Sequence, residues 1–488
     1  MAIHFPQLSL LPLARYAQFL APDRLQRALA AVDELRLRFE GHAVWNVSSS
    51  AVGGGVAEMV RSLLAYARGA GIDARWVVID GPPEFFRITK RLHNALHDST
   101  GDGSPLGTHE HALYRRVVEA NGLELLPLVR PGDFVIVHDP QPAALIADAV
   151  ARGAHVIWRC HIGHDVQTPE VRLGWDFLAP YVRPAAAYVF SRAAYVPPQL
   201  DRARAVVIPP SIDPCSAKNQ PLSEAACRAI LVQSRLVDGP RDPDAAVFSL
   251  EDGSPGRVDR AAEVLDECAR PTLDTPLIVQ VSRWDRLKDP IGVLHGFARL
   301  DGFADAHLVL AGPSLGSVAD DPEGLAVFQE TFDAWRALPP AIRTRAHLAS
   351  LPSADVDENA AIVNALQRHA RIIVQKSLFE GFGLTVTEGM WKARPVVASA
   401  VGGIRDQIDD GVQGLLLDDP RDPDALARAL GRILGDPGLG VRLGAAGHQR
   451  VLERYLGLDS LLRFGALLGQ IGAHASPPAS VVASPDPL

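Results

Sequence analysis

The stretch RIIVQKSLFEGFGLTVTEGMW, residues 371–391, decides how this chain is expected to fold. Its run of Ile and Val predicts a buried β-strand, and LTVTEGMW predicts a helix that follows a Gly-Phe-Gly turn. Backbone N–H groups from Gly381 to Leu384, through Phe382 and Gly383, should therefore point out of the helix start toward an anion. Glu380 and Glu388 flank this start, and carboxylates beside an anion site suit hydroxyl groups. The stretch thus predicts a negatively charged ligand that carries hydroxyls, such as a nucleotide-sugar or a sugar phosphate.

The same alternation of apolar runs and helical windows extends over most of the chain. The runs end in Gly, Pro, Asp or His, which is typical of buried parallel strands in a doubly wound sheet. They form two series, so we expect an α/β fold with two Rossmann-like domains whose strand ends face a central cleft. The first series lies at 43–47, 74–80, 133–140, 155–161, 185–191 and 205–210, and the second at 276–283, 306–313, 371–377 and 395–400.

Composition changes along the chain set the expected domain boundaries. Residues 213–275 are charged and rich in Pro and Gly, so they are predicted to be an interdomain connection with an insertion. We therefore predict one domain over 1–212 and another over 276–454. A C-terminal helix over about 455–473 is expected to pack back on the first domain, and the Pro/Ser-rich segment 474–488 is predicted to be a disordered tail.

Overall composition excludes several classes of function. The 488 residues carry 48 Lys and Arg against 57 Asp and Glu, a net charge of −9, and no basic run, which argues against nucleic-acid binding. Four cysteines without a CxxC pair fit a reducing compartment and suggest no metal site. No signal peptide or membrane span is recognisable, so a cytoplasmic protein is expected.

Two further loops carry groups suited to phosphate. Gly53, Gly54 and Gly55 lie between a strand and a helix, where backbone N–H groups can approach a ligand, although a tight turn without a ligand fits equally well. Arg283 and Lys288 follow the first strand of the second series and could clamp a phosphate or diphosphate. Loop charges are more often only solvated, but the carboxyl ends of parallel strands are where open sheets bind ligands.

Two polar residues of the first series suit hydroxyl recognition. His161 follows the strand at 155–161, and a single histidine that donates a hydrogen bond to a substrate hydroxyl is a simpler hypothesis than a metal site. The alternative for His161 is a core histidine with satisfied hydrogen bonds. Asp139 follows the strand at 133–140, and its alternative role is a turn or a cap.

These motifs together resemble a known family. The E-x7-E pattern of Glu380 and Glu388, with Arg283 and Lys288 upstream, resembles the retaining glycosyltransferases of the GT-B fold. More narrowly, six blocks between about residues 43 and 415 resemble the trehalose glycosyltransferring synthases and the related trehalose phosphorylases. The blocks are VWNVSSSAVGGGVAEM, GIDARWVVIDGPPEFFRITKRLHNALHD, VHDPQPAAL, WRCHIGHD, PSIDPCSAKN and EGFGLTVTEGMWKARPVVASAVGGI.

The resemblance implies that glucose is transferred with retention from a nucleoside diphosphate glucose (UDP, ADP or GDP) to glucose, reversibly, giving α,α-trehalose without metal or cofactor. It implies that Arg283 and Lys288 bind the phosphates and that Glu388 binds the ribose. Glu380 and His161 would contact glucose hydroxyls of the donor, assisted by the amides of Gly381 to Leu384. The catalytic set is thus His161, Arg283, Lys288 and Glu380; Gly54 and Gly55 would lie near the leaving group, and Asp139, Glu84 and Asn94 would form the acceptor side.

Two alternatives remain open from the sequence. A trehalose phosphorylase would hold phosphate or glucose 1-phosphate with the same cations, so the motifs do not separate it from a synthase. A non-catalytic sugar-nucleotide binding protein is less favoured, because a sensor has no need for both carboxylates, His161 and the cation pair. A homodimer is left open, with small-molecule substrates as the expected partners.

Overall fold

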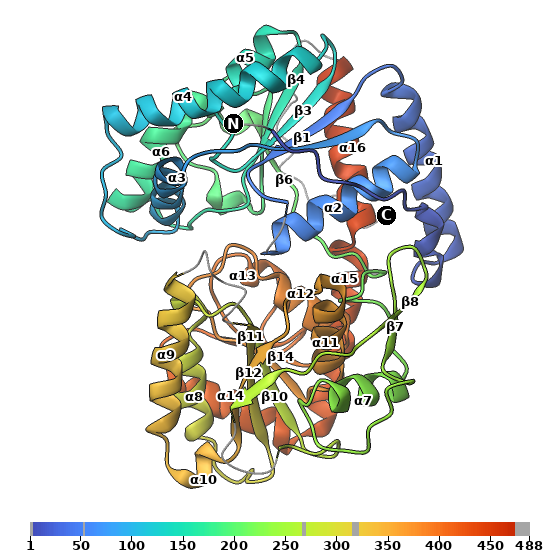
Figure 1. Ribbon diagram of the computed structural model, residues 1–488, viewed down its shortest axis with the longest axis vertical. Helices are drawn as coiled ribbons and strands as arrows, with labels where there is room; N and C mark the ends of the chain where they lie inside the picture. The colour runs from blue at the N-terminus through green and yellow to red at the C-terminus, as the bar shows by residue number, and fades with distance from the viewer. Residues whose placement is uncertain (1–2, 52–53, 266–269, 315–321, 474–488) are drawn as a thin grey trace. The chain divides into compact units, whose positions relative to one another are not determined.

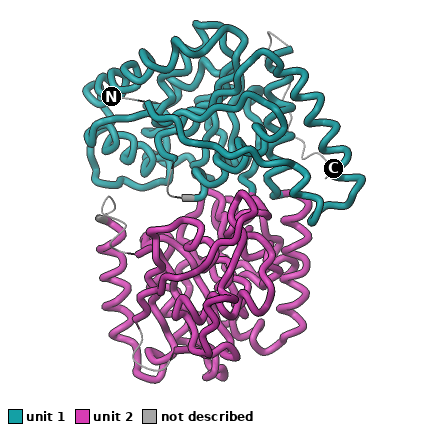
Figure 2. The backbone as a smooth tube through the Cα atoms, turned by 45° about the vertical axis from the view of Figure 1, so that its right-hand side comes forward, with its two compact units in different colours: residues 1–211, 455–488 teal, residues 212–454 magenta. Residues whose placement is uncertain are grey.

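The computed structural model describes residues 3–51, 54–265, 270–314 and 322–473. The chain divides into two compact units, shown in different colours in Figure 2. Unit 1 comprises residues 1–211 and 455–488, and unit 2 comprises residues 212–454. Each unit has its own apolar core, built on its own sheet.

Unit 1 contains a six-stranded sheet in which every strand pair is parallel. The strand order is β2-β1-β3-β4-β5-β6, the flavodoxin-like arrangement in which the winding direction reverses between β1 and β3. All six apolar runs of the first series form strands, as predicted. Their bounds are β1 (Val44–Ser48), β2 (Ala74–Val78), β3 (Phe134–His138), β4 (His155–Arg159), β5 (Ala187–Phe190) and β6 (Ala205–Val207).

Helices cover both faces of this sheet, because side chains of one strand alternate between the faces. Trp45 and Val47 of β1 join one apolar cluster, and Val44 joins the other. The helices α3, α4, α5 and α6 lie on one side of the sheet, and α1, α2 and α16 lie on the other (Figure 1). Their bounds are η1 (Leu13–Gln18), α1 (Pro22–Arg38), α2 (Gly54–Gly69), α3 (Pro83–Leu96), α4 (Thr108–Leu125), η2 (Leu126–Leu128), α5 (Leu145–Ala151), α6 (Pro169–Val182), η3 (Ala193–Tyr195), η4 (Arg202–Arg204) and α16 (Gly457–Ala473).

Unit 2 contains a seven-stranded sheet of order β15-β14-β13-β10-β11-β12-β9. The edge strand β9 pairs antiparallel with β12 and the other neighbouring strands pair in parallel, with the winding direction reversing between β10 and β13. The bounds are β9 (Glu263–Leu265), β10 (Leu277–Val281), β11 (His307–Pro313), β12 (Ala346–Leu351), β13 (Ile372–Gln375), β14 (Val396–Ser399) and β15 (Leu415–Leu417).

The helices of unit 2 surround this sheet in the same doubly wound manner (Figure 1). Phe297, Trp335 and Leu430, from three of these helices, are buried in one apolar cluster with the sheet. The helix bounds are α7 (Glu224–Gln233), η5 (Arg286–Lys288), α8 (Pro290–Ala298), α9 (Pro322–Arg336), α10 (Pro340–Arg343), α11 (Val356–His369), α12 (Leu384–Trp391), α13 (Ile404–Gln407), α14 (Pro423–Gly435) and α15 (Pro437–Arg454).

The segment predicted as a connection, 213–275, is part of unit 2 in the structure. It contains α7, the antiparallel pair β7 (Val247–Ser249) and β8 (Pro255–Arg257), and β9, which pairs with β12 at the sheet edge. Side-chain contacts explain why these charged residues are ordered: Glu358 of α11 accepts hydrogen bonds from the backbone N–H groups of Asp259 and Arg260 at 2.6 Å each. The predicted tail, 474–488, lies outside the described residues.

The chain's last described helix, α16, belongs to unit 1 and packs on α1 and α2. Within the described residues, no helix is both long enough and apolar enough to cross a bilayer. Each sheet has one point where the winding reverses at the carboxyl ends of its parallel strands, which is where such sheets bind ligands.

Candidate active site

In unit 2, the loops after β10 and β13 meet through an ion pair at the reversal point of the sheet. Lys288 Nζ lies 2.8 and 2.6 Å from the two carboxylate oxygens of Glu380. Ser377 Oγ donates to Glu380 Oε2 at 3.0 Å, and both charged side chains are largely buried. The structure thus brings together two predicted catalytic residues. The ammonium group of Lys288 has three N–H donors and contacts both carboxylate oxygens of Glu380.

The start of α12 has the geometry that the Gly-Phe-Gly turn predicts. Gly383 is the N-cap with φ 89 and ψ 60, a left-handed conformation that favours glycine. Gln407 Nε2 donates to the carbonyl oxygen of Phe382 at 2.5 Å, and Thr387 Oγ1 donates to Gln407 Oε1 at 2.7 Å. Gln407 therefore stabilises the turn. The helix begins at Leu384, and its N-terminus carries partial positive charge.

Arg283 lies in the same β10 loop but does not share the Lys288–Glu380 pair. Its Nη2 lies 3.2 Å from Asp285 Oδ2, and 59% of its side chain is exposed. Asp285 also accepts from the backbone N–H of Leu287 at 2.8 Å and so caps η5. An exposed guanidinium anchored at one edge can still offer its remaining N–H groups to an anionic ligand.

Glu388, the second acid of the predicted pair, is buried one helical turn into α12. Lys218 Nζ lies 3.8 Å from its Oε1, and Gln367 Nε2 donates to its Oε2 at 3.4 Å. Lys392, also buried, donates to the Glu388 backbone oxygen at 3.3 Å and to Asn219 Oδ1 at 2.9 Å. Burial lowers the pKa of Lys392 to about 7, although the negative charge of Glu388 opposes this shift. The Glu388 carboxylate thus has one long amide hydrogen bond and one ion pair as its partners.

In unit 1, Asp139 and His161 meet beside the reversal point between β1 and β3. Asp139 Oδ1 accepts from the backbone N–H of His161 at 2.8 Å, and Asp139 itself has φ 61. Burial raises the pKa of Asp139 to about 6, while the His161 amide and the Arg159 guanidinium oppose that rise. Asp139 thus bonds the backbone after β4, not a helix start or a local turn, and the charged form of its carboxyl group is disfavoured by its surroundings.

His161 is linked to two buried residues that sequence reasoning did not single out. His138 Nδ1 lies 3.1 Å from His161 Nε2, and His138 Nε2 lies 3.0 Å from Asn46 Oδ1. Burial lowers the pKa of His138 to about 3 and that of His161 well below its ordinary value, with Arg159 adding to both shifts. Two neutral rings can share this chain only if His138 donates to Asn46 and His161 Nε2–H donates to His138. His161 Nδ1, which is buried with no partner among the described residues, is then an acceptor, whereas the hypothesis from the sequence had His161 donate to the hydroxyl.

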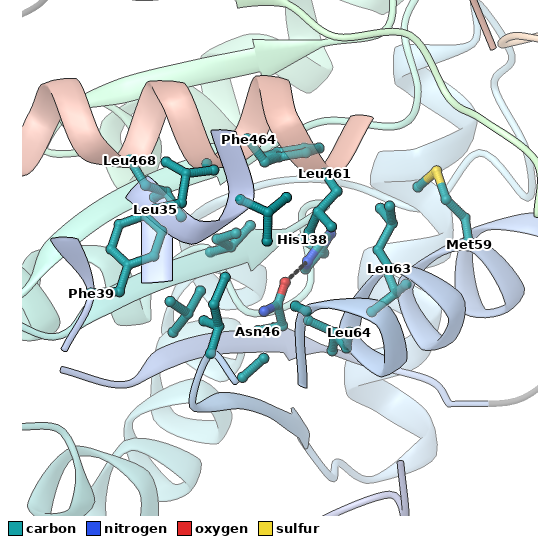
Figure 3. A pocket seen from close by; sticks show the side chains of 18 of the residues that line it. Leu35, Phe39, Asn46, Met59, Leu63, Leu64, His138, Leu461, Phe464 and Leu468 are labelled. Carbon is teal, nitrogen blue, oxygen red and sulfur yellow. Dashed lines mark hydrogen bonds between the residues drawn. The ribbon is translucent and has the colours of Figure 1, made fainter. Parts of the chain in front are cut away.

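Asn46, His138 and His161 also line a cavity of about 70 Å³ in unit 1. Its other walls are apolar side chains of the sheet and of α1, α2 and α16, including Leu35, Leu64 and Leu468 (Figure 3). Figure 3 shows the Asn46–His138 hydrogen bond among these apolar side chains. The polar chain therefore contributes polar atoms to the lining of an otherwise apolar cavity.

The remaining predicted residues are less tightly organised. Gly54 is the first residue of α2 and Gly55 follows it, while Gly53 lies outside the described residues. Glu84, in the first turn of α3, is exposed and lies 3.5 Å from Arg87. Asn94, near the end of α3, is partly buried, and its carbonyl oxygen accepts from the N–H groups of His97 and Ser99 at 2.9 Å each.

Comparison with solved structures shows the GT-B glycosyltransferase fold. A sucrose-phosphate synthase from Thermosynechococcus elongatus aligns over 88% of this chain and 100% of its own, with a TM-score of 0.62 and 17% identity. A UDP-forming α,α-trehalose-phosphate synthase from Burkholderia xenovorans aligns over 89% and 100%, with a TM-score of 0.64 and 16% identity.

Sequence comparisons give a narrower result. The family described as "Trehalose synthase, N-terminal domain" matches residues 46–197, and "Glycosyl transferases group 1" matches residues 269–450. A trehalose synthase from Pyrococcus horikoshii is 34% identical over 92% of this chain and 94% of its own, and one from Rubrobacter xylanophilus is 35% identical over 90% and 94%. A trehalose phosphorylase from Pleurotus pulmonarius is 26% identical over 80% of this chain but only 52% of its own. The chain belongs to the trehalose synthase family of glycosyltransferases.

Proposed function

We propose that this enzyme transfers glucose, with retention of anomeric configuration, from a nucleoside diphosphate glucose to free glucose and so forms α,α-trehalose. The observation that carries the proposal is the arrangement in unit 2, where Lys288, Glu380 and the N-terminus of α12 meet at the reversal point of the sheet. A cation and helix N–H donors suit the diphosphate, and a carboxylate between them suits sugar hydroxyls.

The donor side of the reaction is assigned to unit 2. Breaking the anomeric C–O bond leaves an oxocarbenium-like sugar and a diphosphate with growing negative charge. Arg283, Lys288 and the start of α12 stabilise that charge as it develops, which lowers the barrier more than it strengthens ground-state binding. Glu388 is held by Gln367 and Lys218 in a fixed orientation, as a group that binds the two ribose hydroxyls should be.

The proton transfer follows from the same charges. In our proposal the glucose hydroxyl attacks from the face that the diphosphate leaves, and its proton passes to the departing phosphate oxygen. The hydroxyl oxygen then forms the new bond to the anomeric carbon, and the donor's C–O bond electrons stay with the diphosphate. In our proposal His161 Nδ1 accepts a hydrogen bond from a sugar hydroxyl.

The relatives support a synthase over a phosphorylase. The trehalose synthases match nearly the whole length of both chains, whereas the phosphorylase matches 52% of its own length at 26% identity. In our proposal Glu388 binds the ribose hydroxyls, and glucose 1-phosphate offers no ribose.

The test is to incubate the purified protein with glucose and, in separate reactions, UDP-glucose, ADP-glucose, GDP-glucose or glucose 1-phosphate. Trehalose made from a nucleotide donor, with both anomeric centres α by NMR, is the expected result. Product from glucose 1-phosphate alone would select the phosphorylase, and no trehalose from any donor would contradict both enzyme assignments. A β configuration at the glucose that comes from the donor would contradict retention.

A further inference from the structure

Asp289, the residue after Lys288, has a backbone conformation that needs an explanation. Its φ is 48 and its ψ is 52, in the left-handed region that residues other than glycine rarely adopt. Asp289 also caps α8, because its Oδ1 accepts from the backbone N–H of Gly292 at 3.1 Å. A cap alone does not require the left-handed region, since caps commonly have extended backbone.

The other carboxylate oxygen of Asp289 meets a buried lysine. Lys376 follows β13, only 1% of its side chain is exposed, and its Nζ donates to Asp289 Oδ2 and to the carbonyl oxygen of Pro420. A buried ammonium group is costly unless it is paired and hydrogen-bonded, so this pair strongly prefers a single geometry. Asp289 is adjacent in the chain to Lys288, and Lys376 is adjacent to Ser377, which contacts Glu380.

The pair joins the two loops that hold Lys288 and Glu380. Ser377 donates to Glu380 Oε2 at 3.0 Å. The backbone N–H of Leu378 donates to the Leu287 carbonyl oxygen at 2.8 Å, and Gln280 Nε2 donates to the Lys288 carbonyl oxygen at 2.9 Å. The loop after β10 and the loop after β13 are therefore tied together next to the Lys288–Glu380 pair.

We propose that Lys376 and Asp289 are positioning residues that hold Lys288 against Glu380 for the transfer step. This inference rests on the proposed function, because it takes Lys288 and Glu380 as the groups that contact the donor. Neither Lys376 nor Asp289 contacts substrate in the proposal. Their pair fixes the backbone turn from which the Lys288 side chain departs, and a charge placed about 1 Å away from its productive position loses much of its effect on the developing phosphate charge.

Gly292 provides a second way to test the pair without removing either charge. A Cβ at this position would overlap Asp289 Oδ2 and would lie 2.5 Å from Lys376 Nζ, so Gly292→Ala must separate the two side chains. Gly431→Ala is the matched control, because the nearest neighbouring heavy atom to a methyl group on that helical glycine would be 3.7 Å away, at Phe303.

The experiment compares Lys376→Met, Gly292→Ala and Gly431→Ala with the unchanged enzyme in steady-state kinetics. We expect kcat to fall about tenfold or more in the first two variants while the donor KM changes less than about threefold, because the loss is in the transition state. Gly431→Ala should keep both constants. Unchanged kcat in both Lys376→Met and Gly292→Ala, with the protein folded, would overturn the proposal.

A double variant separates positioning from general stabilisation. Asp289→Asn keeps the cap oxygen and a side chain that tolerates the left-handed region, so Lys376→Met with Asp289→Asn removes both charges together. We expect this double variant to melt at a higher temperature than Lys376→Met while its kcat stays low. Recovery of kcat together with the melting temperature would show that the pair serves folding alone.

Hydrogen exchange tests the Lys376–Asp289 pair independently of catalysis. Amides of residues 286–289 and 381–384 should exchange faster in Lys376→Met and Gly292→Ala, but not in Gly431→Ala. If the unchanged protein makes no trehalose from any donor, the proposed function is refuted. Faster exchange in Lys376→Met and Gly292→Ala would even then support the role of the pair in positioning Lys288. Unchanged exchange would overturn the positioning role whatever the activity.

Discussion

At the scale of single residues, Asp139 links stability to pH. Its pKa is raised from 3.8 to about 6 by burial, so its contribution to stability is fully present below pH 3.8 and is lost as the pH rises through about 6. Asp139→Asn keeps an oxygen that accepts from the His161 amide but carries no charge. We expect the variant to be more stable than the unchanged protein at pH 7.5, by at most about 3 kcal/mol, and nearly equal to it at pH 4. Urea denaturation at both pH values checks this, and an equal difference at both would contradict it.

Arg283 is predicted to matter for activity and not for folding. Its side chain is mostly exposed and its ion pair with Asp285 is a surface pair, which contributes little to stability. Arg283→Ala should therefore melt like the unchanged protein but lose about 2–4 kcal/mol of transition-state stabilisation, measured as kcat/KM for the nucleotide donor. Arg428→Ala is the matched control and should keep full activity. Arg428 is an exposed arginine on α14 that pairs with Asp422. Near-normal turnover of Arg283→Ala would show that the phosphates bind elsewhere.

At the scale of elements, the glycine that starts α12 should affect both stability and donor binding. At Gly383 a methyl group would meet Ile404 Cγ1 at 3.1 Å and Glu380 Cγ at 3.2 Å, and φ is 89. Gly411 has φ 76 with nothing within 4 Å of the added carbon. Both glycine-to-alanine variants should lose about 1–2 kcal/mol of stability through backbone strain, but only Gly383→Ala should bind a nucleoside diphosphate more weakly. Calorimetric titration measures the second effect, and equal weakening in both variants would refute the assignment.

Elements with a local signal could be predicted from the sequence, and elements made by tertiary pairing could not. The strand β13 is a run of Ile and Val and was expected, whereas β12 contains His347 and Ser350 and has no such run. The short strand β9 forms because it pairs with β12. The charged residues around it led us to predict an interdomain connection there, and no strand. Strand pairing at an edge depends on a partner about 80 residues away in the chain, which periodicity does not detect.

The candidate site divides in the same way. Residues such as Lys288 and Glu380 could be placed at strand ends from the sequence, because strand ends of a doubly wound sheet gather at one edge. Their direct pairing across 92 positions, and the His161–His138–Asn46 chain, depend on side-chain geometry that the sequence does not encode locally. The sequence shows whether such a residue is acidic or basic, but it does not show the atom with which each side chain forms a hydrogen bond or an ion pair.

At the scale of the whole molecule, the two units should respond to different ligands. The groups assigned to the nucleotide, Arg283, Lys288 and Glu388, all belong to unit 2, and Asp139 and His161 belong to unit 1. A nucleoside diphosphate without sugar should therefore slow hydrogen exchange first in the loops after β10 and β13 and in the first turn of α12. At one hundred times its Kd it should stabilise the folded state of unit 2 by about 2.7 kcal/mol. Glucose should protect the loops after β3 and β4 in unit 1, and strongest protection of those loops by the nucleotide alone would reverse the assignment of the two units.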